Sequence, residues 1–238
     1  SSFDSARQCI LRWFFASNSG TSMPTQSAAD GTLIHSLAER FPCGPRSAVM
    51  DALEEEIRAM GVDEGQAASK IHMDHLREMA SALGEYLEQS TQMGSCADPN
   101  GNVQVEVPFD VPISSVHIRG RIDRMELEGQ GVRIIDFKTG KKGNKTGAKK
   151  DPDHPQLALY QLAVEQLGYE VLGAELKYLG YGDVRTISQD PLDPETRADW
   201  ISQLDEIGQK MKGPSFIATP SDEACQYCEF ARSCPARE

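Results

Sequence analysis

The chain has 238 residues, of which 39% are hydrophobic and 25% are charged. This size fits a globular protein with one substantial core, or one core and a small appendage. No apolar run approaches a membrane span and no signal pattern is present, so we expect a cytoplasmic protein without a membrane partner. The net charge of -12 argues against a nucleic-acid partner, although the distribution of charge matters more than its sum. Because the chain starts without Met, we expect a domain of a longer polypeptide.

The N-terminal part of the chain has helical patterning. Apolar residues at helical spacing predict helices over residues 2–16, 30–40, 46–60 and 64–89. The first is short and apolar with Cys9 at its middle, and the second carries His35. Residues 17–29 are polar and rich in Gly, Ser, Thr and Pro, which favours a loop. We therefore expect a helical block ahead of the sheet.

Strand patterning begins near residue 102. Apolar and polar residues alternate over 103–109, which places Glu106 on the face opposite the valines. The segment 116–138 then predicts a β-hairpin, because two runs rich in β-branched and apolar residues flank the turn-forming residues 128–131.

The register of this hairpin predicts a metal site. A symmetric turn pairs positions whose numbers sum to 259, so Asp123 faces Asp136 and Arg121 faces Lys138. Opposed carboxylates, about 5 Å apart at Cβ, repel each other, and a divalent cation between them reverses the sign of the interaction. The alternative is a surface hairpin whose acids pair with Arg121 and Lys138.

Lys138 projects on the same side as Asp136, because alternate residues of a strand share a face. This set suits metal-assisted hydrolysis, in which carboxylates hold a hard cation and the lysine orients or deprotonates the attacking water. Residues 138–150 hold six lysines and no acid, and these lysines include Lys141, Lys142 and Lys145. This segment is either a DNA-contacting loop or a solvated flexible loop.

The remaining elements complete a mixed pattern. A helix over 154–166 puts Gln156 and Tyr160, at i and i+4, on one face. A strand over 171–181 and a long helix over 193–211 follow. The order of helices, strands, helix, strand and helix predicts a mixed α/β core with a helical insertion before it.

The C-terminal residues lack periodicity but hold three cysteines. Cys225, Cys228 and Cys234 form a C-x2-C-x5-C arrangement. Three thiolates need a fourth ligand. The spacing alone is equally compatible with tetrahedral zinc and with an iron-sulfur cluster. Cys43 and Cys96 fall outside this pattern, and we take them as ordinary thiols.

Four of these segments occur together, in order, in a known family. Gly120–Asp123, Ile135–Gly140 and Gln156–Tyr160 resemble the second, third and QxxxY motifs of the RecB/AddB-like branch of the PD-(D/E)XK nucleases. Gly31–His35 is similar to the upstream GxxxH motif of that branch. Ile122 replaces the Pro of the family name, without chemical cost because only the Asp is a ligand. The resemblance implies a restriction-endonuclease-like α/β fold, with a mixed sheet core flanked by helices and an N-terminal helical block.

The resemblance also implies a ligand set. His35, Asp123, Asp136 and the backbone carbonyl of Phe137 would bind the metal, and Lys138 would serve the water. An imidazole among oxygen ligands tilts the preference from Mg²⁺ toward Mn²⁺ without excluding Mg²⁺.

The resemblance also implies roles for residues beyond the metal ligands. Gln156 and Tyr160 would line the site and either contact DNA or position Lys138. Arg121 and the lysines of the loop would contact DNA. Glu106 is a further candidate ligand, because an acid on the neighbouring strand occurs in this branch with a less uniform role.

Cys9 resembles the first cysteine of the split iron-sulfur site of AddB-like and CRISPR-associated nucleases, with Ile10 in place of the usual Pro. It would complete a [4Fe-4S] site with the three C-terminal cysteines, and zinc is the alternative. We thus expect a single nuclease domain over residues 1–238, composed of a helical insertion at 45–95, a catalytic core at 102–190, and a cysteine staple from 1–16 and 220–238.

The function implied by the resemblance is metal-dependent cleavage of DNA. We expect an exonuclease of DNA repair, recombination or CRISPR adaptation, acting on single-stranded or end-bearing DNA beside a helicase, recombination or CRISPR protein. The alternative is a non-catalytic iron-sulfur or zinc module that binds DNA or acts as a scaffold in a helicase-nuclease complex. The presence of every expected catalytic residue counts against this alternative.

Overall fold

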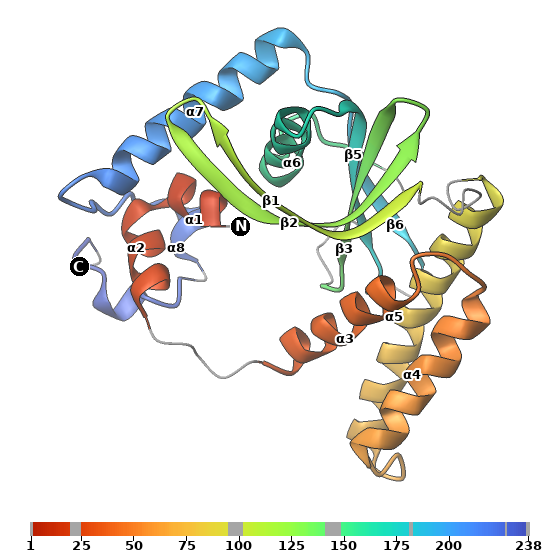
Figure 1. Ribbon diagram of the computed structural model, residues 1–238. Coiled ribbons are helices and arrows are strands. Elements are labelled where there is room, and N and C mark those ends of the chain that lie inside the picture. The colour runs from red at the N-terminus through yellow and green to blue at the C-terminus, as the bar shows by residue number, and fades with distance from the viewer. Residues whose placement is uncertain are drawn as a thin grey trace. The chain divides into compact units, whose positions relative to one another are not determined.

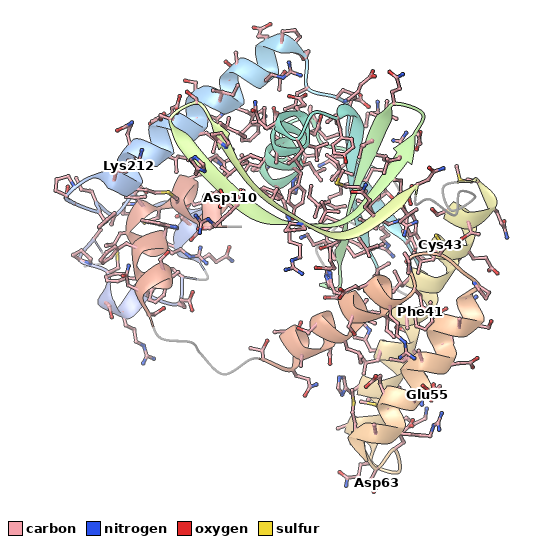
Figure 2. All side chains as sticks on the ribbon, in the orientation of Figure 1. Phe41, Cys43, Glu55, Asp63, Asp110 and Lys212 are labelled. Atoms are coloured by element: carbon pink, nitrogen blue, oxygen red, sulfur yellow. The ribbon has the colours of Figure 1, made fainter. Side chains whose placement is uncertain are left out.

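The structure is a computed structural model, shown as a ribbon in Figure 1 and with its side chains as sticks in Figure 2. It describes residues 2–19, 25–94, 102–140, 149–180, 183–226 and 228–236. The chain forms two compact units. Unit 1 comprises Ser1–Met23, Pro112–Ile118 and Leu192–Glu238, and unit 2 comprises Pro24–Val111 and Arg119–Pro191.

A six-stranded mixed sheet runs in the order β1-β2-β3-β5-β6-β4. The strands are β1 (Val103–Ile113), β2 (Val116–Glu128), β3 (Gly131–Lys138), β4 (Lys149–Lys150), β5 (Glu170–Tyr178) and β6 (Arg185–Gln189). β2 and β3 are antiparallel, β3 and β5 are parallel, and β5 and β6 are antiparallel. The predicted restriction-endonuclease-like α/β architecture, a mixed sheet flanked by helices, is confirmed. Two short strands, β4 and β6, were missing from the predicted elements.

The register of the β2–β3 hairpin is the predicted one. Partners run from Glu128 opposite Gly131 to Arg124 opposite Ile135, and each pair of numbers sums to the predicted value. The turn between the strands uses Gly129 with a φ of 67°, which glycine adopts without strain. The regular pairing ends at Arg124 and Ile135, one pair before the two aspartates.

Helices cover both faces of the sheet in unit 2 (Figure 1). They are α3 (Gln26–Arg40), α4 (Arg46–Met60), α5 (Ala67–Gln92) and α6 (Pro155–Gln166). The first three share one core with Ile135, Phe137 and Leu179, so they lie against the face to which odd-numbered residues of β3 point. α6 covers the opposite face, toward which Asp136 projects. α3 begins four residues before the predicted start because Thr25 caps it by accepting a hydrogen bond from the Ala28 amide.

Unit 1 contains the helices α1 (Ser2–Gln8), α2 (Ile10–Asn18), α7 (Pro194–Lys212) and α8 (Asp222–Cys225), with a 3₁₀ turn at Ala231–Ser233. The single helix predicted over residues 2–16 is wrong, because Cys9 has extended dihedral angles (φ -160°, ψ 111°) and separates α1 from α2. Phe3 of α1 contacts Trp200 of α7, with ring centroids 6.3 Å apart. Asp205 of α7 accepts hydrogen bonds from Ser114 and Ser115 at the tip of the β1–β2 hairpin. These contacts hold together three stretches that are far apart in the sequence.

The prediction that Cys43 is an ordinary thiol is wrong. The residue is disulfide-bonded. Pairing depends on spatial proximity, and a cysteine outside any motif gives no sign of it in the sequence. Cys96 lies outside the described residues.

Within the described parts of the chain, no helix combines the length and the apolar composition needed to cross a lipid bilayer.

Candidate active site

Asp123 connects β2 to two other elements of unit 2. Its Oδ2 atom accepts a 2.7 Å hydrogen bond from the backbone N–H of Phe137 on β3. The same oxygen lies 3.4 Å from Nδ1 of His35 on α3. The hydrogen bond to Asp123 raises the pKa of His35 above its usual value, and the charges of Asp136 and Glu106 act in the same direction. One carboxylate therefore joins the GxxxH helix α3 to β3, the strand that carries Asp136.

Glu106 on β1 completes a group of three ligand side chains. One ligand atom from each of His35, Glu106 and Asp123 lies within 4.8 Å of the others, and all three side chains are partly exposed. Among the described residues, this is the group of His, Cys, Asp or Glu whose spacing suits a metal ion. Two carboxylates and one imidazole suit a divalent cation such as Mn²⁺ or Mg²⁺. Glu106 is thus better placed than the sequence alone indicated.

Glu106 also has an unusual backbone. Its φ is 51°, in the left-handed region that non-glycine residues rarely adopt. Such a conformation costs of order 1–3 kcal/mol and is typical of functional sites. The strand pattern of residues 103–109 gave no sign of this local change, and Glu106 was only the weaker candidate ligand implied by the family resemblance. Arg121 lies 3.4 Å from the Glu106 carboxylate, and its own side chain is largely exposed.

Asp136 lies deeper than the group of three. Only 3% of the residue is exposed, and this burial raises the pKa of its carboxyl, while the charge of Lys138 acts in the opposite direction. Lys138 Nζ lies 2.6 Å from its Oδ2 atom, although not in the orientation of a regular hydrogen bond. Its Oδ1 atom accepts a 2.8 Å hydrogen bond from Gln156 Nε2. Asp136 is therefore held between the lysine of its own strand and helix α6.

Gln156 and Tyr160 lie on one face of α6, as predicted from their spacing. Gln156 donates a 2.9 Å hydrogen bond to the Tyr160 hydroxyl. That hydroxyl lies 3.1 Å from Asp136 Oδ1 and 3.2 Å from the carbonyl oxygen of Arg121, either of which can accept its single proton. Burial and the Asp136 charge raise the pKa of Tyr160 well above its usual value, so the hydroxyl keeps its proton.

Two glycines of the motifs permit close contacts beside these residues. A Cβ on Gly120 would lie 2.6 Å from the ring of Phe109, and that ring packs edge-on against Tyr160 with centroids 6.1 Å apart. A Cβ on Gly31 would lie 3.1 Å from Oγ1 of Thr139, so its absence lets α3 approach the end of β3. His35 lies one helical turn after Gly31, which explains physically why the two residues occur together.

Residues 1–235 match the family model of the PD-(D/E)XK nuclease superfamily. The chain belongs to this superfamily. PD-(D/E)XK nucleases are metal-dependent phosphodiesterases, and the group of two carboxylates and one histidine beside Asp136 and Lys138 fits that chemistry.

Two phage proteins are similar to this chain. The chain is 26% identical over 152 residues to the Gene 69 protein of Mycobacterium phage L5, covering 62% of this chain and 49% of the relative. It is 24% identical over 142 residues to the Gene 69 protein of Mycobacterium phage D29, covering 58% and 49%. The chain thus spans about half the length of the curated relatives it matches.

Two solved structures are also similar. The crystal structure of SSO0001 has 16% identity and a TM-score of 0.39, with 87% of this chain and 96% of that chain covered. The crystal structure of protein VC1899 from Vibrio cholerae has 15% identity and a TM-score of 0.28, with 79% and 52% covered.

A second cluster of potential ligands lies in unit 1. Cys9, Cys225, Cys228 and Cys234 are free thiols and line one small pocket of about 30 Å³. Apolar side chains, including Leu11, Phe15 and Phe230, line the same pocket. Although partial burial opposes it, hydrogen bonds from Thr219 and from the start of α2 lower the pKa of the Cys9 thiol. The chain thus brings together the four cysteines that the sequence grouped.

Some predicted residues remain outside this geometry. Lys141, Lys142 and Lys145 lie outside the described residues. The backbone carbonyl of Phe137 lies in β3, where Phe137 pairs with Lys177 of β5, and its role as a ligand stays a prediction. The regular pairing of β2 and β3 stops just before Asp123 and Asp136, so the Asp123 contact with Phe137 replaces a ladder hydrogen bond at the point where the site begins.

Proposed function

We propose that this chain is a DNA exonuclease of the RecB/AddB-like branch that hydrolyses phosphodiester bonds with a metal-activated water. The observation that carries the proposal is the convergence of four motifs from α3, β2, β3 and α6. They bring His35 to Asp123, Asp123 to Phe137, and Gln156 to Asp136. The alternative, a surface hairpin whose acids pair with nearby basic side chains, would not require partners from four different elements.

The ligand set of the proposed site is His35, Glu106 and Asp123, with Asp136 and the carbonyl of Phe137 beside them. A divalent cation supplies polarisation of a phosphoryl oxygen and a bound water of lowered pKa. The partial exposure of His35, Glu106 and Asp123 leaves room for a phosphate to approach. We place Glu106 among the ligands because its strained backbone brings its carboxylate next to His35 and Asp123.

Lys138 and Asp136 have a separate role in this mechanism. Lys138 Nζ lies 2.6 Å from Asp136 Oδ2 and remains one-third exposed, so it can reach a water at the mouth of the site. It orients the attacking water and holds or releases a proton there. Gln156 and Tyr160 fix the opposite oxygen of Asp136, which prevents that carboxylate from rotating away from the lysine.

The substrate that we propose is single-stranded or end-bearing DNA. The largely exposed Arg121 lies beside Glu106 and is suited to contact a phosphate, and the lysines of residues 141–145 follow directly from the catalytic strand. The proposed setting is DNA repair, recombination or CRISPR adaptation, in company with a helicase or recombination protein.

The four free cysteines are proposed to hold a [4Fe-4S] cluster, with zinc as the alternative. The four cysteines line one pocket, so either group would draw its four ligands from the same set. The apolar side chains of this pocket support the cluster, because they would shield it from water.

The test is cleavage of end-labelled linear and circular DNA, single- and double-stranded, with Mn²⁺ or Mg²⁺. Lys138→Ala is the inactive variant, and Lys70→Ala is its matched control because Lys70 is an exposed lysine of α5 that also pairs with an aspartate. We expect Lys138→Ala to lower the cleavage rate about 100-fold or more, and Lys70→Ala to leave it unchanged.

Each outcome decides a part of the proposal. Release of mononucleotides or short products from linear but not circular DNA supports an exonuclease, whereas cleavage of circles indicates an endonuclease. Absence of cleavage under every condition, or equal cleavage by Lys138→Ala, contradicts the catalytic function and favours a DNA-binding or scaffolding module.

A further inference from the structure

The strands that carry the two aspartates lose their regular pairing just before the site. The last backbone pair is Arg124 with Ile135, and Asp123 and Asp136 lie one residue beyond it. On the side of the site, one hydrogen bond between Asp123 and the Phe137 amide joins the strands. A metal site needs its ligands held to within a fraction of an ångström, so a second restraint is needed at this point.

That restraint lies on the opposite face of the sheet. Arg124 follows Asp123 and Phe137 follows Asp136, so both side chains point away from the site. Both meet Tyr86 of α5. The rings of Tyr86 and Phe137 pack edge-on with centroids 5.6 Å apart, and the Arg124 guanidinium lies 5.8 Å from the Tyr86 ring centroid.

A buried polar network fixes Tyr86 in this position. Its hydroxyl donates a 2.9 Å hydrogen bond to Glu126 Oε1, which also accepts from Ser90 at 2.8 Å and from Arg124 Nε at 2.6 Å. Arg124 is fully buried and additionally donates to the carbonyl oxygen of Pro42 at 2.5 Å. Removing one member of such a buried network is costly, which makes the arrangement rigid.

We propose that Tyr86 is a positioning residue, which sets the distance between the metal-binding ends of β2 and β3 from the back of the sheet. This inference rests on the proposed function of the site. The path is short: the Tyr86 ring supports the Phe137 side chain, and the Phe137 amide holds the Asp123 carboxylate. Loss of the ring allows Phe137 to shift, and Asp123 shifts with it.

The ring and the hydroxyl of Tyr86 have separable roles. Tyr86→Leu removes the ring contacts with Phe137 and Arg124. Tyr86→Phe keeps the ring and removes only the hydrogen bond to Glu126. The matched control is Leu76→Ala, because Leu76 is fully buried on the same helix and lies about 15 Å along its axis from Tyr86.

The experiment measures Mn²⁺ binding by calorimetry on the full chain, together with thermal unfolding with and without Mn²⁺. We expect Tyr86→Leu to weaken Mn²⁺ binding at least tenfold and to reduce the rise in Tm that saturating Mn²⁺ gives. Tyr86→Phe and Leu76→Ala are expected to bind Mn²⁺ within about threefold of the unchanged chain, although both lower the Tm. If Tyr86→Leu does not fold, Tyr86→Met serves in its place, because its flexible side chain fills the space without a ring.

Two results overturn the proposal while the proposed function stands: normal Mn²⁺ binding by the variant without the ring, or an equal loss of binding in Leu76→Ala. In the second case the effect is general loosening of the helical core. Absence of Mn²⁺ binding by the unchanged chain overturns the proposed function, and the positioning role with it.

Discussion

The backbone N–H of Phe137 donates a 2.7 Å hydrogen bond to Oδ2 of Asp123, where the pairing of β2 and β3 has just ended. The carboxylate therefore has two tasks, which are to join the strands and to carry negative charge toward His35. A substitution that keeps one oxygen acceptor and removes the charge separates these tasks.

Asp123→Asn is that substitution. Its amide oxygen still accepts from Phe137, so we expect the free energy of unfolding to change by less than about 1 kcal/mol. Metal binding is expected to weaken about 100-fold or more, because a neutral amide is a poor substitute for a carboxylate. Calorimetric titration with Mn²⁺ measures this loss. Asp110→Asn is the control, since Asp110 is an exposed acid of β1 that pairs with Arg119, and it should bind Mn²⁺ normally.

Glu106→Gln tests the ligand that the sequence ranked lowest. Loss of its charge is expected to weaken Mn²⁺ binding about tenfold to 100-fold, because Glu106 lies with His35 and Asp123 in one group. The affinity is measured in the same titration. Unchanged affinity would leave the strained backbone of Glu106 without a role in metal binding.

Gly120→Ala probes the space over the QxxxY helix. The added Cβ would lie 2.6 Å from the Phe109 ring, so the ring must move and its contact with Tyr160 is lost. We expect about 1–3 kcal/mol of destabilisation and a cleavage rate about tenfold lower. The double variant Gly120→Ala with Phe109→Leu should recover part of the stability, because it restores room. Gly140→Ala, where the Cβ meets nothing within 4 Å, is the control for glycine replacement.

The buried Glu126 predicts how stability depends on pH. Burial opposes its ionisation, but the Arg124 charge and hydrogen bonds from Arg124, Ser90 and Tyr86 together lower its pKa below the usual value of 4.5. A group whose pKa is lowered by folding contributes stability above its unfolded pKa, and this contribution is lost as the pH falls through the folded pKa. Urea unfolding of the metal-free chain from pH 6 down to acid should therefore show a loss of stability below about pH 4.5.

Glu126→Gln checks the assignment. This variant leaves the buried Arg124 without its charge partner, so it is expected to be less stable at neutral pH by about 3–5 kcal/mol. Its stability should fall less steeply in acid, because one titrating carboxyl is missing. An equal slope for both proteins would mean that other carboxyls govern the acid transition.

The four free cysteines predict the metal content of unit 1. Chain purified without oxygen is expected to contain about four irons and to absorb visible light. Cys225→Ser should lose both the iron and the absorption, whereas Cys43→Ser should keep them, because Cys43 is disulfide-bonded and lies outside the four-cysteine pocket. Stoichiometric zinc in place of iron, measured by elemental analysis, would select the alternative.

The sequence pattern was enough to predict the structure where the structure depends on residues that are close together in the chain. The turn at Gly129 and the alternation of β2 and β3 fixed the register, and the i, i+4 spacing put Gln156 and Tyr160 on one side of α6. The helix at Arg46–Met60 matched its predicted bounds, because its apolar positions repeat at regular helical spacing and a proline precedes it.

Features that depend on tertiary contacts were not predictable in the same way. The positive φ of Glu106 and the helix break at Cys9 interrupt patterns that look continuous in the sequence. β6 has only five residues and gains its place by pairing with β5, and the bonded state of Cys43 leaves no local mark. His35 was assigned through its motif, because a single histidine on a helix does not reveal which strand it meets.

The break at Cys9 has a consequence for the order in which the molecule is made. Cys9 is the first of the four cysteines to be synthesised, and Cys234, which lines the same pocket, follows roughly 225 residues later. At about 5–20 residues per second, the first thiol waits roughly 10–45 s for the last one. All residues of the candidate active site, up to Tyr160, have been synthesised by then. Closure of the four-thiol pocket therefore follows the synthesis of every residue of the candidate active site.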